Sequence, residues 1–283
     1  MNKNFILVAQ NTLTEDYVTQ ACLCAMSIHA TTPGASVSVI TDDTIPDEYT
    51  GLFEHIIPIP WGDLAEKYDW KIHNRWKIYF ISPYESAVVL DTDMLVLEDL
   101  TRYFEFFENY DIWLTSNVLD YRGNSITSDF YRKRFTKYNL PNVYFGLHYF
   151  KKSDFALDFY NWLDIITNNW KEFYNVDNNL IQDWASMDIT AAMTTSILDC
   201  ESKVTNSTLT SPTFVHMKPN IQNWAGVTEK WQTKVGTYLT DDLELYIGNF
   251  KQSGIFHYTE NDFVTSNILT AYKNKVGIIN NEV

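Results

Sequence analysis

Short apolar runs alternate with stretches of helical periodicity over about the first ninety residues. The runs are rich in β-branched side chains, as in NFILVA and SVSVIT, and polar residues bound them, which is typical of buried strands. They predict strands at residues 4–9, 36–41, 54–59 and 87–90. Apolar residues at helical spacing predict helices at residues 16–30 and 71–81. Pro58 cannot donate a hydrogen bond to a sheet, so the third strand should lie near an edge.

The order strand, helix, strand, strand, helix, strand predicts an α/β fold with a mainly parallel mixed sheet flanked by helices. Ligands of such sheets bind beyond the carboxyl ends of the strands. Polar residues that follow a strand directly are therefore the first candidates for a site: Gln10, Asn11, Asp42, Asp43, Asp91 and Asp93.

The pattern is looser after Leu100. It predicts strands at residues 111–116, 143–150, 213–217 and 254–258, and helices at residues 153–170, 186–198 and 262–275. The chain contains no internal repeat, low-complexity segment or linker, so we expect one domain over residues 1–283.

The net charge of the chain limits which ligands it can bind. Lys and Arg total 21 and Asp and Glu total 36, which gives a net charge of −15 and makes nucleic acid and a bare membrane surface poor partners. An anionic nucleotide would therefore need a metal ion or local cations. One basic group stands out in this acidic chain: Arg122, Arg132, Lys133, Arg134 and Lys137.

The remaining composition is that of an ordinary folded protein. The N-terminal apolar run is too short for a signal peptide, and no stretch reaches the roughly 18 apolar residues of a membrane span. The three cysteines have no paired spacing, so we expect no disulfide framework. Together these features favour a cytoplasmic location.

The tripeptide Asp91-Thr92-Asp93 carries the clearest chemistry, because it directly follows the apolar strand 87–90. Two carboxylates at a strand end can converge on one point, and hard oxygen ligands suit Mg²⁺ or Mn²⁺ bridging a diphosphate. Haloacid dehalogenase-like phosphatases also place Asp-x-Asp after a strand, with the first Asp as nucleophile. Their pair usually closes the first strand, whereas three predicted strands come before this one. A phosphatase also needs a late acidic pair, and Asp241-Asp242 is the only adjacent one.

The first hundred residues resemble the GT-A glycosyltransferases, especially the glycogenin and lipopolysaccharide galactosyltransferase group, glycosyltransferase family eight. That family follows its first strand with a polar turn, a Tyr and a characteristic helix, which this chain matches at Tyr17, Ala21, Leu23, Cys24, Ser27 and Ile28. It places a Lys sixteen positions before the first Asp, where this chain has Arg75. Residues 75–100 are the most specific part of the resemblance.

Downstream the resemblance is partial. The family's Asn-x-Gly strand corresponds to Tyr144-Phe145-Gly146, without the Asn, and its Asp-Gln pair corresponds to Asp188-Ile189, without the Gln. Asp183 is the nearest alternative to Asp188.

The family ends its site with a His followed by Lys-Pro. His216, followed by Lys218-Pro219, fits that pattern, and His257 is a near-equal rival with better spacing from Asp188. We favour His216 slightly. The four other histidines are assigned structural roles: His29, His55, His73 and His148.

The resemblance implies a GT-A fold with a nucleotide-binding half at residues 1–100 and an acceptor-side half at residues 101–283. It implies sugar transfer from a nucleoside diphosphate sugar, a UDP-sugar in our prediction, to a carbohydrate or other hydroxyl acceptor, with retention of configuration. Asp91, Asp93 and one of His216 and His257 would hold Mn²⁺ or Mg²⁺. The remaining donor contacts would be Ala9, Gln10, Asn11, Tyr17, Arg75, Thr92 and Lys218.

Asp188 would stabilise the positive charge that develops on the sugar, or would position the acceptor. A catalytically silent nucleotide-sugar-binding protein remains open as an alternative. A nucleotidyltransferase is disfavoured, because the first turn, Ala-Gln-Asn-Thr, lacks a glycine-rich phosphate loop.

Overall fold

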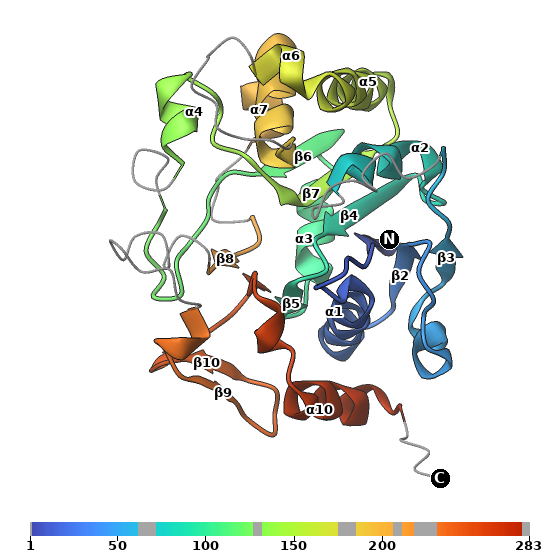
Figure 1. Cartoon of the computed structure of the whole chain (residues 1–283), viewed down its shortest axis with the longest axis vertical. Coiled ribbons are helices and arrows are strands. Elements are labelled where there is room, and N and C mark those ends of the chain that lie inside the picture. The colour runs from blue at the N-terminus through green and yellow to red at the C-terminus, as the bar shows by residue number, and fades with distance from the viewer. Residues whose placement is uncertain are drawn as a thin grey trace.

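The computed structural model describes residues 2–61, 72–126, 132–174, 185–205, 211–217 and 231–278. Its centre is a six-stranded sheet with helices on both faces (Figure 1). The strands, in spatial order, are β3 (His55–Ile57), β2 (Ala35–Ile40), β1 (Lys3–Val8), β4 (Ser86–Leu90), β7 (Tyr144–Lys151) and β6 (Ile112–Thr115). The first four are parallel, and β7 runs antiparallel to both β4 and β6. The predicted α/β fold with a mixed, mainly parallel sheet is confirmed, and β3 lies at the edge as Pro58 indicated.

Alternation along the strands divides the core into two clusters. On β1, Phe5 and Leu7 belong to the cluster that includes helix α1 (Tyr17–Thr31), whereas Ile6 belongs to the cluster beneath helix α5 (Asp154–Asn168). All three side chains are fully buried, because a central strand is covered on both faces. Figure 1 shows α1 and α10 (Ser266–Val276) on one side of the sheet, with α5 and α7 (Met187–Ile197) on the other.

Two smaller sheets complete the strand inventory. In the first, β12 (Ile255–His257) pairs antiparallel with β5 (Met94–Val96) and parallel with β8 (Phe214–His216). In the second, β10 (Leu245–Ile247) lies between β9 (Thr237–Leu239) and β11 (Phe250–Lys251). The first sheet matters for function, because β5 directly follows the Asp91–Asp93 loop.

The remaining elements are short. The helices are α2 (Ile78–Ile81), α3 (Thr101–Phe107), α4 (Lys133–Lys137), α6 (Trp170–Tyr174) and α8 (Glu201–Val204). The 3₁₀ turns are η1 (Asp47–Leu52), η2 (Ile72–Lys77), η3 (Trp231–Thr233) and η4 (Asn261–Phe263).

Several predicted boundaries were wrong. The helix predicted at 71–81 is the 3₁₀ turn η2 followed by the short α2, and Ser82-Pro83 ends it as expected. The helix predicted at 153–170 is interrupted at Asn169, which separates α5 from α6. The prediction also missed β5, α3 and the β9–β11 sheet. The missed strands are only two or three residues long, which is too short to show a period.

Within the described residues, no helix is both long and apolar enough to cross a membrane. Cys22, Cys24 and Cys200 are buried free thiols that pack as small apolar side chains.

Candidate active site

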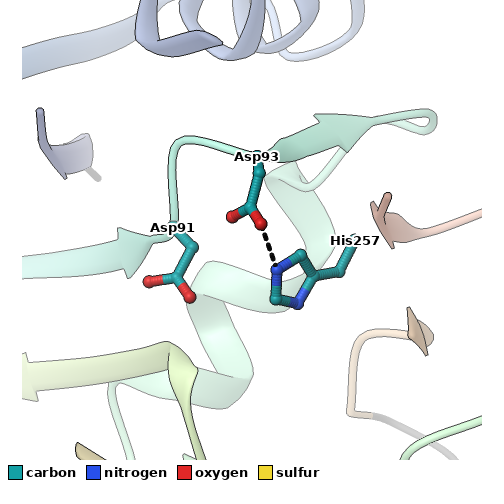
Figure 2. A group of neighbouring side chains, drawn as sticks. All are labelled: Asp91, Asp93 and His257. Carbon is teal, nitrogen blue, oxygen red and sulfur yellow. Dashed lines mark hydrogen bonds and ion pairs between the residues drawn. The ribbon is translucent and has the colours of Figure 1, made fainter. Parts of the chain in front are cut away.

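The loop Asp91-Thr92-Asp93 joins β4 to β5 at the carboxyl end of the parallel strands (Figure 2). It is fastened on two sides: the Asp91 amide donates to the Gly146 carbonyl of β7 at 2.8 Å, and the Tyr258 amide donates to the Asp93 carbonyl at 3.1 Å. Thr92 between them is buried. The loop therefore has a defined backbone, and the two carboxylates are held near one place.

His257 completes a group of three possible metal ligands with these carboxylates. One ligand atom from each of Asp91, Asp93 and His257 lies within 4.8 Å of the other two, and this is the one such group among the residues described. Figure 2 shows His257 approaching from β12, with its Nε2 at 2.8 Å from Asp93 Oδ2. Two carboxylates and an imidazole form a donor set that suits Mn²⁺ or Mg²⁺.

Gly146 makes room for Asp91. A Cβ at position 146 would lie 2.6 Å from Asp91 Oδ2, closer than real Cβ atoms approach, and 3.1 Å from Met94 Cε, which is a tight contact. The absence of a side chain at this position of β7 therefore allows the Asp91 carboxylate to lie against the strand.

Arg75, from η2, forms an ion pair with Asp91, with 2.6 Å between its Nη1 and Asp91 Oδ1. Burial raises the pKa of Asp91, although the guanidinium of Arg75 opposes that rise. Burial also opposes ionisation of Asp93, but attraction and a hydrogen bond to His257 outweigh it, so the pKa of Asp93 is lowered. The pKa of His257 is raised for the reciprocal reason: attraction to Asp93 outweighs burial. Asp91 thus faces the guanidinium of Arg75, and Asp93 faces the imidazole of His257.

The predicted nucleotide-side residues lie at the ends of β1 and α1. The Ala9 amide donates to the Ile40 carbonyl at 3.0 Å, and Gln10 is buried. The Asn11 amide donates to Asp43 Oδ2 at 2.7 Å, while its side-chain oxygen accepts from the Val18 amide at 3.0 Å. Asn11 therefore has a local structural role, because it satisfies a free N–H of the first turn of α1.

The negative charges of Asp91 and Asp93 act on the hydroxyl group of Tyr17. Burial raises its pKa to about 12, and Asp93 adds to the rise. The phenol therefore stays protonated and can donate a hydrogen bond.

Asp188 is the second residue of α7, and two groups hold its carboxylate. The Phe145 amide donates to Oδ1 at 2.7 Å, and Arg132 Nη2 lies 3.1 Å from Oδ2. The negative charge of Asp188 contributes to the raised pKa of Asp91, so the fold places Asp188 in the region of the Asp91–Asp93 loop. Sequence reasoning did not select Arg132, although its membership of the one basic group was a usable signal.

The two rival histidines are neighbours. Because β8 and β12 are parallel and in register, His216 lies directly opposite His257, and the ring centroids are 4.4 Å apart. Only His257 belongs to the group of three ligands with Asp91 and Asp93. Lys218, and the alternative acid Asp183, lie outside the described residues.

Other residues singled out in the sequence have local roles. His29 Nε2 contacts the Leu52 carbonyl at 2.8 Å, and the exposed His55 lies beside Glu54. His148 is bound between the Phe145 carbonyl and the Tyr160 hydroxyl, and burial lowers its pKa to about 3. The side chain of His73 is outside the described part. Asp241 and Asp242 lie in the exposed turn between β9 and β10 and do not belong to the Asp91 group.

No family model matches this chain, and no curated protein sequence matches it. Several solved structures are similar to it. The galactosyltransferase LgtC, in complex with donor and acceptor sugar analogs, matches with a TM-score of 0.54 at 14% identity, over 99% of this chain and 97% of LgtC. The bifunctional glycosyltransferase WbbM matches with a TM-score of 0.50 at 11% identity, over 97% of this chain and 49% of WbbM.

The glycosyltransferase GlyE of Streptococcus pneumoniae TIGR4 matches with a TM-score of 0.41 at 12% identity over 73% of this chain, which spans 45% of the length of GlyE. That score is too low to carry an argument. At these identities the likeness to LgtC and WbbM shows a shared fold, the GT-A fold of glycosyltransferases.

Proposed function

We propose that this chain is a metal-dependent glycosyltransferase that moves a sugar from a UDP-sugar to a hydroxyl acceptor. The observation that carries the proposal is the convergence of Asp91, Asp93 and His257 at the carboxyl end of β4 in a GT-A fold. In α/β sheets of this kind, that end of the strands is where ligands bind.

The residues present fit a divalent cation. Asp91 and Asp93 would hold it through carboxylate oxygens and His257 through a ring nitrogen, a set of hard and borderline ligands that Mn²⁺ and Mg²⁺ accept. When bound, such an ion neutralises the charge of a diphosphate and so makes it a better leaving group. This would answer the electrostatic problem set by a net charge of −15.

The donor contacts in this proposal surround the carboxylates. Arg75, already placed beside Asp91, would bind donor phosphate or sugar oxygens through its paired N–H groups. Ala9, Gln10, Asn11 and Tyr17 would hold the base and ribose, because they follow the first strand at the same edge of the sheet. Thr92 and Lys218 complete the predicted donor set.

Asp188 would act on the sugar. An anionic carboxylate near the anomeric carbon stabilises the positive charge that develops as the bond to the diphosphate breaks. The Phe145 amide donates to one of its oxygens, so the carboxylate is held beside β7 before any substrate arrives. In this proposal residues 1–100 serve the donor, residues 101–283 serve the acceptor, and the anomeric configuration is retained.

The test is the thermal stability of the protein with UDP in Mn²⁺ and in chelator. We expect UDP to raise the melting temperature far more with Mn²⁺, because a ligand stabilises the state it binds. Asp93→Asn should abolish that difference and leave the melting temperature without ligand close to that of the wild type. An equal UDP effect in chelator would contradict the metal site. Metal-dependent UDP binding without turnover of any UDP-sugar would instead indicate a silent nucleotide-sugar-binding protein.

A further inference from the structure

One member of the basic group is buried, and the proposed function leaves it without a role. Arg132 is 8% exposed, whereas Arg122 and Lys137 are exposed and Arg134 is half-buried. Burying a cation is costly unless it is paired and hydrogen-bonded. The contacts of Arg132 therefore show which groups compensate for the burial of its charge.

The Arg132 guanidinium is held on four sides. Its Cζ lies 3.6 Å from the centroid of the Phe135 ring and 4.0 Å from that of Tyr144. At its edge, Nη1 donates to Asn142 Oδ1 at 3.0 Å, and Nη2 forms an ion pair with Asp188, 3.1 Å from Oδ2. A planar cation with donors on its edge suits this arrangement, whereas an ammonium would match only part of it.

The contact with Asp188 fixes a carboxylate that is still within reach of a ligand. The side chain of Asp188 is 32% exposed, whereas that of Arg132 is 7% exposed. The Phe145 amide of β7 binds the other oxygen of Asp188 at 2.7 Å. The carboxylate is thus oriented from two directions by buried groups.

The same contacts lead toward the proposed metal ligands. The Tyr144 ring that lies against Arg132 also meets His216, with 5.6 Å between centroids, and His216 stacks on His257 at 4.4 Å. Arg132 therefore lies at one end of a row of packed rings that ends at His257. A shift at Arg132 would be transmitted to packed neighbours, because protein interiors contain little free space.

We propose that Arg132 is the positioning residue for Asp188, which sets the carboxylate's angle toward the donor sugar. This inference rests on the proposed function. Arg132 itself is buried behind Asp188 and acts through it. Its loss should reduce turnover and leave UDP binding intact, since Arg132 contacts none of the predicted diphosphate ligands in the described part of the chain.

The experiment compares wild type with Arg132→Met, Arg132→Lys and Asn142→Ala, with Lys137→Met as the matched control. Lys137 is an exposed cation at the end of α4, the short helix that Arg132 directly precedes, and its ammonium lies over the Tyr138 ring. The readouts are stabilisation by UDP with Mn²⁺, and kcat and KM for UDP release from UDP-galactose and UDP-glucose. We expect Arg132→Met to lower kcat about tenfold or more and to change KM by less than about threefold.

Arg132→Lys should recover part of the lost kcat, because it restores the charge without the planar fork. Asn142→Ala should show a smaller loss of kcat, because this variant retains the Arg132 cation. It also provides a second test if Arg132→Met does not fold. Kinetics equal to those of Lys137→Met would overturn the inference. So would an equal loss of UDP stabilisation, which would indicate a general structural role.

A crystal structure of Arg132→Met decides the matter without substrate. We expect the Asp188 carboxylate to be displaced or rotated, and an unchanged carboxylate would overturn the inference. Failure of the proposed function is distinguishable, because it would appear in the wild type as UDP stabilisation that is absent or independent of Mn²⁺.

Discussion

At the scale of single residues, the site depends on what position 146 lacks. Asp91 Oδ2 lies 2.6 Å from where a Cβ of residue 146 would be, and the Asp91 amide donates to the carbonyl of the same glycine. A closely packed position of this kind does not tolerate an added methyl group without a shift of its neighbours.

Gly146→Ala should therefore displace Asp91 and destroy metal-dependent UDP binding. We expect loss of the Mn²⁺-dependent rise in melting temperature, with a cost of about 1–3 kcal/mol in the free energy of unfolding from overpacking. Gly51→Ala is the matched control, since a Cβ at residue 51 meets nothing within 4 Å. Normal UDP binding by Gly146→Ala would contradict the placement of Asp91.

The two histidines differ in one contact. From the sequence we favoured His216 slightly as the metal ligand, and that ranking is untested. The geometry supports the reverse, because His257 Nε2 is 2.8 Å from Asp93 Oδ2 and only His257 belongs to the group of three ligands.

His257→Ala should weaken Mn²⁺-dependent UDP binding about tenfold or more, as loss of a ligand or of its support typically does. His216→Ala should cost less, because it removes a packed neighbour of the ligand. Titration calorimetry of UDP with Mn²⁺ would rank the two variants. A larger loss for His216→Ala would restore the ranking that the sequence favoured.

At the scale of elements, one hydroxyl joins helix α1 to the strand that follows the carboxylates. Ser27 Oγ accepts from the Val96 amide of β5 at 2.9 Å and donates to the Cys24 carbonyl at 2.7 Å, and its side chain is fully buried. This gives a physical reason for the serine in the helix pattern on which the family resemblance rests. The helix thereby fixes the strand beyond Asp93.

Ser27→Ala should lower the free energy of unfolding by about 1–3 kcal/mol, because the buried Val96 amide would lose its acceptor. Thr31→Ala is a suitable control from the same helix, since the Thr31 hydroxyl bonds to carbonyls of its own helix at Ser27 and Ile28. Urea denaturation followed by circular dichroism would measure both. Equal stability of the two variants would remove the proposed link between α1 and β5.

At the scale of the whole molecule, charge limits how a diphosphate can bind. The chain carries a net charge of −15, and three of its acidic residues, Asp91, Asp93 and Asp188, lie in the region of the site. Arg75 is the cation that the structure places directly on Asp91. Binding of an anionic donor should therefore depend strongly on it.

Arg75→Ala should weaken UDP binding in the presence of Mn²⁺ by about 1.5–3 kcal/mol, the range for hydrogen bonds to charged groups. Arg75→Lys should fall between this variant and the wild type, because an ammonium keeps the charge but not the paired donors. Calorimetry at fixed ionic strength would measure the difference. Unchanged affinity would leave Arg75 with the sole role of pairing with Asp91.

Local patterns were sufficient for the longer elements and for part of the site. Period-two and apolar runs depend on near neighbours along the chain, so the strands β1, β2, β4 and β7 and the helices α1, α5 and α7 could be predicted within a few residues. The same reasoning placed Asp91 and Asp93 at a strand end, because a buried parallel strand must stop where carboxylates begin.

Other features depend on contacts between distant segments. His257 lies 164 residues from the Asp93 that it contacts, and His216 lies beside it only because β8 and β12 pair in register. The fit of Gly146 against Asp91 and the pairing of Arg132 with Asp188 likewise join segments that no local period relates. The sequence by itself determined the longer strands and helices and which residue types can do the chemistry. Only the tertiary structure decided which of these residues meet, because that depends on strand order, register and packing across the sheet.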